Sequence, residues 1–220
     1  MPNKTAAVFF DLDGTLVDTA PDMVGALLRL CDEEQQPHPD LIQARNVVSD
    51  GSLGLVNLAF GLEQEAEDRE QRIQRFLALY AKYICEDSRL FRGIDELISA
   101  IETAAIPWGI VTNKPGWLTE PLLKALRLDE RVVCQFSGDS LPERKPHPAP
   151  MFAAAKAANV DPEHCIYLGD AERDIAAGNA AGMITLTALW GYIETSHTPS
   201  AWGADGLLEN PTDVLAWLRT

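Results

Sequence analysis

The sequence predicts an α/β protein: a three-layer, doubly wound parallel sheet of the Rossmann-like kind, with an inserted all-helical cap. From residue 91 onward, strand-like stretches alternate with helical patterns of about 10–15 residues, which is typical of parallel sheets. Residues 6–10 form a continuous apolar run, as strands buried on both faces do. Residues 17–90 show helical patterns and no convincing strand. We therefore expect a core of residues 1–16 and 91–220 and a cap of residues 17–90.

The first expected strand ends in two aspartates, Asp11 and Asp13, and Gly14 follows at once. Side chains alternate along an extended chain, so both carboxylates would lie on one side of it. Carboxylates this close repel each other unless a cation or a shared proton relieves them. Gly14 allows the backbone to turn sharply and to approach a ligand. The pattern favours an Mg²⁺ site, with a nucleophilic carboxylate beside an acid–base carboxylate, over a plain Asp-rich turn.

The cap pattern begins with a helix for which Thr19 is the expected N-cap. Pro21 lies in its first turn and Asp22 follows three residues after the cap. The remaining expected cap elements are a helix over 41–48, a loop over 49–52, a short helix ending at 60–61 and a long charged helix over about 65–86.

The second part of the chain supplies the rest of the expected sheet, because each strand-like stretch follows a helical one. In order, the elements are helix 95–104, strand 108–113, helix 117–126, strand 132–136, helix 149–158, strand 165–170, helix 171–181 and strand 183–187.

Polar side chains stand at the carboxyl ends of three of the expected strands. Asp11 and Asp13 end the first strand, Thr112 and Asn113 end the second, and Asp170 ends the fourth. Open α/β sheets bind their ligands at this edge. Because signals from distant segments converge there, we expect the functional site at the carboxyl edge of the sheet.

Two further charged residues have alternative interpretations. Asp174 lies one turn into the helix after Asp170, where it could simply favour the helix dipole. Lys145 precedes a helix and could be a solvated surface residue. Beside the two aspartates of the first strand, however, Asp170 and Asp174 are better explained as ligands of a hard cation such as Mg²⁺. Lys145 would then be a fixed cation that stabilises a phosphoryl group.

Composition limits the possible partners. The chain has 220 residues, of which 46% are hydrophobic and 23% are charged, as in soluble globular proteins. Its formal net charge of −15 disfavours nucleic acid and anionic membranes, both of which need a basic surface. A small phosphorylated substrate needs only local positive charge and stays possible. We find no room for a signal peptide and no membrane-spanning apolar run, so we expect a cytoplasmic protein. Its expected oligomeric state is a monomer or a homodimer.

Taken in order, these pieces resemble the haloacid dehalogenase-like hydrolase superfamily over essentially the whole chain, including the helical cap. The four motifs of that superfamily are matched by Asp11-Leu12-Asp13-Gly14-Thr15, by Thr112, by Lys145 and by Gly169-Asp170 with Asp174 four residues on. The resemblance implies that Asp11 attacks phosphorus and forms an aspartyl-phosphate. Asp13 would protonate the leaving alcohol and then deprotonate the hydrolytic water. An aspartate at position 13 favours phosphoester chemistry over the dehalogenase and phosphonatase branches.

The resemblance also implies a set of binding residues. Mg²⁺ would be held by the Asp11 carboxylate, the Asp13 carbonyl and Asp170, with Asp174 acting directly or through water. The phosphoryl oxygens would be held by Thr112, Lys145 and backbone N–H groups near Gly14 and Asn113.

Two stretches point further to particular branches. Residues 11–19 and 112–115 are similar to bacterial phosphoglycolate phosphatase-like enzymes. Gly191-Tyr192-Ile193, Pro199 and residues 202–205 are similar to the N-acetylmuramic acid 6-phosphate phosphatases of peptidoglycan recycling. The resemblance therefore implies N-acetylmuramate 6-phosphate as the expected substrate, with phosphoglycolate as the alternative. A phosphosugar mutase and a non-catalytic phosphometabolite-binding protein are weaker alternatives.

Substrate choice is expected to lie in the cap. The candidate residues are Arg45, Ser49, Asp50 and Gly51. Arg45 could pair with a substrate carboxylate, which both candidate substrates carry, or it could be a solvated residue on the face of a helix. Cap closure would exclude water from the phosphoryl site.

Overall fold

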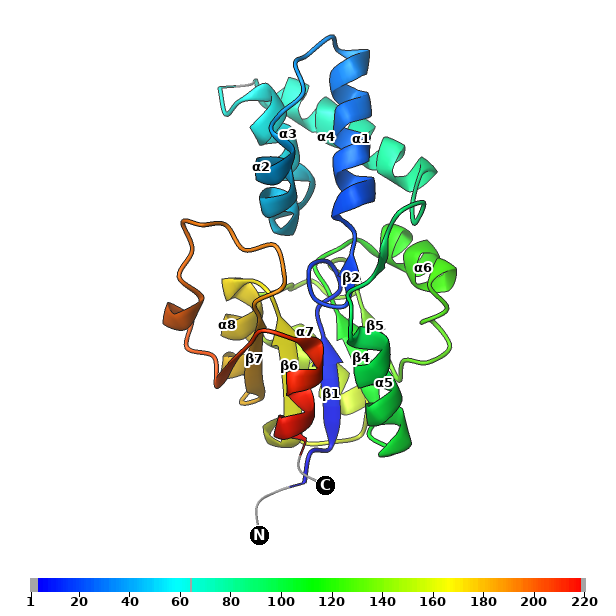
Figure 1. The fold of residues 1–220 in the computed structure, drawn as a ribbon, viewed down its shortest axis with the longest axis vertical. Helices are drawn as coiled ribbons and strands as arrows, with labels where there is room; N and C mark the ends of the chain where they lie inside the picture. Colours follow the sequence, from blue (N-terminus) through cyan, green and yellow to red (C-terminus); the bar gives the residue numbers. More distant parts are fainter. Residues whose placement is uncertain (1–3, 64, 219–220) are drawn as a thin grey trace.

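A computed structural model describes residues 4–63 and 65–218 and contains one six-stranded parallel sheet (Figure 1). Its strand order is β5-β4-β1-β6-β7-β8. The strands are β1 (Ala7–Phe10), β4 (Trp108–Val111), β5 (Gln135–Phe136), β6 (Cys165–Gly169), β7 (Ile184–Ala188) and β8 (Gly206–Leu208). All neighbouring pairs are parallel. The predicted doubly wound sheet is confirmed.

Strand β1 lies near the middle of the sheet and is fully buried because both of its faces are covered by helices. Val8 and Phe10 pack against helices on one face, and Ala7 and Phe9 pack against helices on the other. This alternation is the side-chain period of an extended chain. The flanking helices are α5 (Ile94–Thr103), α6 (Gly116–Ala125), α7 (Ala149–Ala157), α8 (Glu172–Ala180) and the 3₁₀ segment η4 (Pro211–Trp217).

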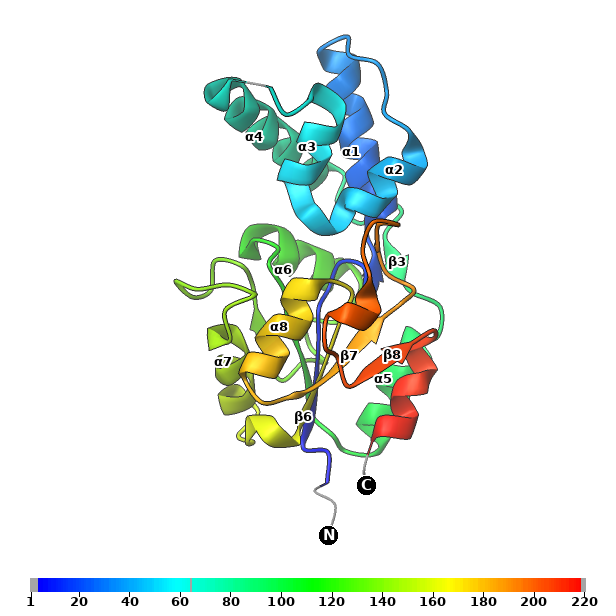
Figure 2. The ribbon, with the colours of Figure 1, turned by 90° about the vertical axis from the view of Figure 1, so that its left-hand side faces the viewer.

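Within the described part of residues 17–90, four α-helices gather above the carboxyl edge of the strands, as Figures 1 and 2 show. They bury an apolar cluster of their own, which includes Leu27, Leu55 and Phe76. Leu118 and Tyr192 of the core join this cluster from below. The cap elements are α1 (Ala20–Glu33), α2 (Leu41–Asn46), the 3₁₀ segment η1 (Val47–Asp50), α3 (Gly51–Phe60) and α4 (Ala66–Lys82).

The chain enters and leaves the cap through a short antiparallel ribbon. It consists of β2 (Val17–Asp18) and β3 (Arg89–Leu90), with Val17 opposite Leu90 and Asp18 opposite Arg89. The expectation of no strand between 17 and 90 is therefore wrong at its two ends. Two-residue strands carry too little alternation to be recognised in a sequence. The residue boundaries that we assign to core and cap stay a prediction.

Asp22, in the first turn of α1, ties the two ends of the cap together. Its buried carboxylate accepts hydrogen bonds from the backbone N–H groups of Asp87 (2.8 Å) and Ser88 (2.9 Å) and from the Ser88 hydroxyl. Bonds to a charged acceptor are among the stronger ones, and their loss leaves buried donors unpaired. Asp22→Ala is expected to lower the free energy of unfolding by about 2–4 kcal/mol. Urea denaturation measures this effect, and Asp129→Ala, at an exposed position, is the control. Equal unfolding midpoints for the wild-type protein and Asp22→Ala would contradict the prediction.

Two other expectations need correction, and one further strand was not expected. Residues 49–52 are not a loop, because η1 runs directly into α3 and Gly51, with φ +68°, provides the change of direction. The third strand is only Gln135–Phe136, at the edge of the sheet, where residue 133 is 44% exposed. Strand β8 was not predicted, because its three residues are too few to show a pattern.

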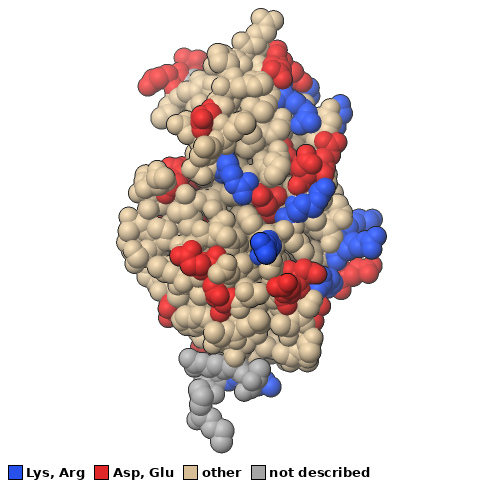
Figure 3. All heavy atoms as spheres, in the orientation of Figure 1, with Lys and Arg blue, Asp and Glu red and all other residues tan. Residues whose placement is uncertain are grey.

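None of the described helices combines the length and the apolar character needed to cross a membrane. Figure 3 shows acidic and basic side chains mixed across one face of the molecule.

Candidate active site

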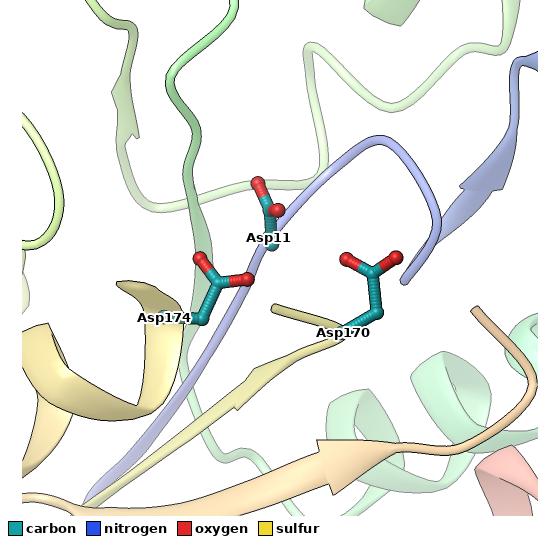
Figure 4. Close-up of side chains that lie close together, drawn as sticks. All are labelled: Asp11, Asp170 and Asp174. Atoms are coloured by element: carbon teal, nitrogen blue, oxygen red, sulfur yellow. The ribbon is translucent and has the colours of Figure 1, made fainter. Parts of the chain in front are cut away.

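Three carboxylates from separate segments meet at the carboxyl edge of the sheet. Asp11 follows β1, Asp170 follows β6, and Asp174 lies in the first turn of α8. Figure 4 shows the three carboxylates close to one another, and one oxygen from each lies within 4.8 Å of the others. All three are at most 4% exposed. The predicted convergence of strand ends thus brings these acids into one cluster.

Lys145 supplies a buried positive charge to this cluster. Its Nζ lies 2.9 Å from Asp11 Oδ1 and 2.6 Å from Asp174 Oδ1, and it also donates to the Tyr167 hydroxyl at 2.9 Å. The Tyr167 hydroxyl in turn donates to the Val111 carbonyl at 2.8 Å. Strands β4 and β6 therefore fix the position of the ammonium group. Burial opposes its charge, but Asp11 and Asp174 outweigh burial and raise the pKa of Lys145.

The three carboxylates together carry more negative charge than the neighbouring positive groups balance. Burial, together with the charges of Asp11 and Asp174, raises the pKa of Asp170 to about 8. Burial and Asp174 likewise raise the pKa of Asp11 to about 6, although Lys145 acts in the opposite direction. Asp170 Oδ1 is buried and has no hydrogen-bond partner among the described residues. A cluster of hard oxygen donors with an unpaired oxygen and surplus negative charge fits a divalent cation such as Mg²⁺.

Gly14 gives this cluster space. A Cβ at that position would lie 2.1 Å from Asp170 Oδ2, and its φ of +81° is one that other residues rarely adopt. Its N–H donates to the Val17 carbonyl at 3.0 Å, so this N–H is already occupied. The contribution of Gly14 that the geometry supports is the close approach of Asp170 to the turn after β1.

Thr112 and Asn113 lie at the end of β4, as expected. Both line a cavity of about 520 Å³ between core and cap, together with Asp11, Asp13 and Lys145. The Thr112 hydroxyl accepts a hydrogen bond from the backbone N–H of residue 114 at 3.1 Å. The Asn113 amide donates to the Lys145 carbonyl at 2.9 Å and so holds the segment that carries Lys145.

Asp13 faces the same cavity but stands apart from the three clustered acids. Its Oδ1 accepts hydrogen bonds from Thr19 Oγ1 (2.6 Å) and Lys114 Nζ (3.0 Å). Thr19 precedes α1 as expected, but its hydroxyl forms no capping bond and turns to Asp13 instead. Lys114 was not among the predicted site residues. The available signal was its place beside Asn113, in a segment already assigned to the site.

The cap contributes Ser49, Asp50 and Gly51 to the cavity lining, and their role in substrate choice stays a prediction. Ser49 Oγ donates to Asp170 Oδ2 at 2.9 Å, so the cap contacts the acidic cluster directly. Arg173, on α8, donates to the Ser49 carbonyl at 2.5 Å and lies 3.9 Å from an Asp50 carboxylate oxygen. Sequence reasoning did not identify Arg173, because an arginine in the first turn of a helix is usually a surface residue.

Arg45 lies outside the residues that line this cavity. Its guanidinium donates to both oxygens of Asp18, at 2.9 Å each, and stands 5.1 Å from the centre of the Tyr192 ring. Tyr192 also donates its hydroxyl to Asp18 (2.7 Å) and its backbone N–H to Asp170 (2.8 Å). The structure thus gives Arg45 a partner at the cap–core connection. Its role in substrate binding stays a prediction.

Comparisons with known proteins agree with this geometry. A family model described as haloacid dehalogenase-like hydrolase matches residues 8–188. A phosphoglycolate phosphatase of Xanthomonas campestris is 42% identical over 94% of both chains. An N-acetylmuramic acid 6-phosphate phosphatase of Pseudomonas putida is 38% identical, over 96% of this chain and 95% of its own.

The fold has a close counterpart among solved structures. The crystal structure of a predicted phosphoglycolate phosphatase from Haemophilus somnus superposes with a TM-score of 0.88 at 25% identity, covering 99% of each chain. Together with four motifs gathered at one sheet edge, these similarities show that the chain belongs to the haloacid dehalogenase-like hydrolase family, among its phosphatases.

Proposed function

We propose that the protein is an Mg²⁺-dependent phosphomonoesterase that acts through an aspartyl-phosphate on a small carboxylated phosphometabolite. The observation that supports this proposal is the set of charged groups around Asp11. This carboxylate, at the end of the central strand, lies between two further acids and the ammonium of Lys145. A buried nucleophile with a fixed cation beside it suits the charge that develops on a transferring phosphoryl group.

In the proposed reaction, Asp11 attacks phosphorus and Asp13 gives a proton to the leaving alcohol. Asp13 then takes a proton from the water that hydrolyses the aspartyl-phosphate. Lys145 and the Thr112 hydroxyl hold phosphoryl oxygens, and the cap residues Ser49 and Asp50 close the cavity over them. Exclusion of bulk water strengthens each of these charged contacts.

The side chains of Asp11, Asp170 and Asp174 would hold the Mg²⁺ ion, with the Asp13 carbonyl as a further ligand. When bound, the ion supplies positive charge that balances the acids and polarises the phosphoryl group. The hydrogen bonds from Ser49 and from the N–H of Tyr192 to Asp170 Oδ2 keep that carboxylate in one orientation. Its other oxygen, which has no partner among the described residues, is the one free to bind the ion.

N-acetylmuramate 6-phosphate is the first candidate substrate. The relative from Pseudomonas putida is an N-acetylmuramic acid 6-phosphate phosphatase. A cavity of about 520 Å³ also falls in the range that holds molecules larger than a two-carbon acid. Phosphoglycolate is the second candidate, supported by the phosphoglycolate phosphatase of Xanthomonas campestris.

The test is a comparison of kcat/KM on N-acetylmuramate 6-phosphate, phosphoglycolate and several sugar phosphates with purified protein. We expect release of free phosphate, with the first substrate preferred by at least about tenfold. Exchange of residues 49–52 should lower kcat/KM on the preferred substrate more than it lowers kcat/KM on a generic aryl phosphate. Equal loss on both substrates would count against a specificity role for the segment. Isomerisation without phosphate release would contradict the phosphatase assignment.

A further inference from the structure

The carboxylate of Asp13 is held from one side only. Oδ1 accepts both of its hydrogen bonds, from Thr19 and from Lys114, whereas no described residue donates to Oδ2. Two donors on one oxygen fix the plane of a carboxylate and leave the second oxygen free. Because Asp13 is partly exposed and lines the cavity, that second oxygen is the one available to a ligand.

Lys114 is itself firmly placed. Its side chain is 4% exposed, although it carries a charge. Its backbone N–H donates to Thr112 Oγ1, and its carbonyl accepts from the N–H of Gly138 at 2.9 Å. Burial disfavours its charge, but Asp13 and Tyr80 outweigh burial and raise the pKa of Lys114 above its ordinary value. The ammonium is therefore a fixed positive charge.

The second neighbour of Lys114 comes from the cap. Its Nζ lies 4.4 Å from the centre of the Tyr80 ring, a distance at which an ammonium group is attracted to the ring face. Tyr80 belongs to α4 and is 1% exposed, with its ring stacked on Phe76. Lys114 thus connects a core carboxylate with a cap aromatic ring.

We propose that Lys114 is a positioning residue: it holds Asp13 Oδ1 so that Oδ2 faces the leaving group, and Tyr80 secures it when the cap is closed. This inference rests on the proposed role of Asp13 as acid and base. The competing role for Lys114 is recognition of a substrate carboxylate. Its two existing partners, on the core and on the cap, favour positioning, because an ammonium committed to both has little freedom to follow a ligand.

Substrates with different leaving groups can distinguish positioning of Asp13 from recognition of a substrate carboxylate. An alkyl phosphate needs a proton on its leaving oxygen, whereas p-nitrophenol leaves without one. Misplacement of the acid should therefore affect kcat/KM on alkyl phosphates far more than on p-nitrophenyl phosphate. If Lys114 instead recognises a substrate carboxylate, its loss should lower kcat/KM only on the ester that carries a carboxylate. Phosphoglycolate, glycerol phosphate and p-nitrophenyl phosphate together distinguish the two.

For Lys114→Met we expect kcat/KM to fall about 100-fold on both alkyl phosphates and less than about tenfold on the aryl phosphate. The matched control is Lys124→Met, which removes an exposed lysine and should change none of the three values. Lys114→Arg keeps the charge and should lose at most about tenfold on the alkyl esters. A loss confined to phosphoglycolate, or an equal loss on all three substrates, would overturn the proposal.

Tyr80 provides a second, independent pair of variants. Tyr80→Phe keeps a ring beside Lys114 and should leave the alkyl-to-aryl ratio of kcat/KM within about twofold. Tyr80→Leu removes the ring and should lower that ratio in the same direction as Lys114→Met. An unchanged ratio in Tyr80→Leu would refute the contribution of the cap. Failure of the wild-type protein to release phosphate from these three esters and from N-acetylmuramate 6-phosphate would refute the proposed function itself. Wild-type turnover with an unaltered Lys114→Met would refute only the role of Lys114.

Discussion

Asp11→Asn is expected to lower phosphatase turnover by at least about 10⁴-fold on every ester that the protein hydrolyses. An amide cannot act as the nucleophile, so the covalent step is lost and not merely slowed. The shape of the side chain is retained, which limits any effect on folding. Steady-state release of inorganic phosphate measures the loss.

The control for this variant is Asp129→Asn, which makes the same chemical change at an exposed position and should keep full activity. Labelled phosphate offers a second measurement. Wild-type protein quenched during turnover should carry covalent phosphate, and Asp11→Asn should carry none. Turnover of Asp11→Asn above about one hundredth of the wild-type rate would exclude Asp11 as the nucleophile.

Removal of divalent metal is expected to reduce turnover by more than about 100-fold, and added Mg²⁺ should restore it. The reason is the charge at the site. Three buried carboxylates lie together, the ammonium of Lys145 pairs with only Asp11 and Asp174, and one oxygen of Asp170 lacks a hydrogen bond from the described residues. A bound phosphate dianion would add further negative charge to this cluster of carboxylates. Activity in excess chelator, before and after Mg²⁺ is returned, is the measurement.

The variant Asp170→Asn tests whether Mg²⁺ binds at this cluster of carboxylates. Titration calorimetry should show Mg²⁺ affinity at least about tenfold weaker than in the wild-type protein. The matched control is Glu172→Gln, which changes an exposed carboxylate in the first turn of α8 and should bind Mg²⁺ as the wild type does. Full activity in excess chelator, or wild-type affinity in Asp170→Asn, would contradict the proposed ion site.

The position of the candidate site at the carboxyl edge of the sheet was predictable because its signals are local. A buried parallel strand is a continuous apolar run, and its carboxyl end is marked by the first polar residue after it. Asp11, Thr112 and Asp170 each meet that description, and the topology of an open α/β sheet then brings them together. No knowledge of side-chain contacts is needed for that step.

The contacts that join cap and core were not predictable in the same way. The contacts of Arg45 with Asp18, Ser49 with Asp170 and Lys114 with Tyr80 form only when segments far apart in the sequence have been placed against each other. Sequence periodicity reports which face of a helix is buried and not which residue of another element it meets. Strand β8 and the ribbon β2–β3 were missed for a different reason, since elements of two or three residues contain less than one full pattern.

The β2–β3 ribbon also bears on how such proteins can diversify. Because Val17 pairs with Leu90, the cap begins and ends at neighbouring points. The whole insertion is therefore equivalent to the loop of a β-hairpin. The entropic cost of closing a connection grows only slowly with its length. A tight turn or a different helical module could therefore be spliced between the same two residues without disturbing the order of the strands. The order of the strands would be kept, and the cap contacts to the site, such as Ser49 with Asp170 and Tyr80 with Lys114, would be exchanged together.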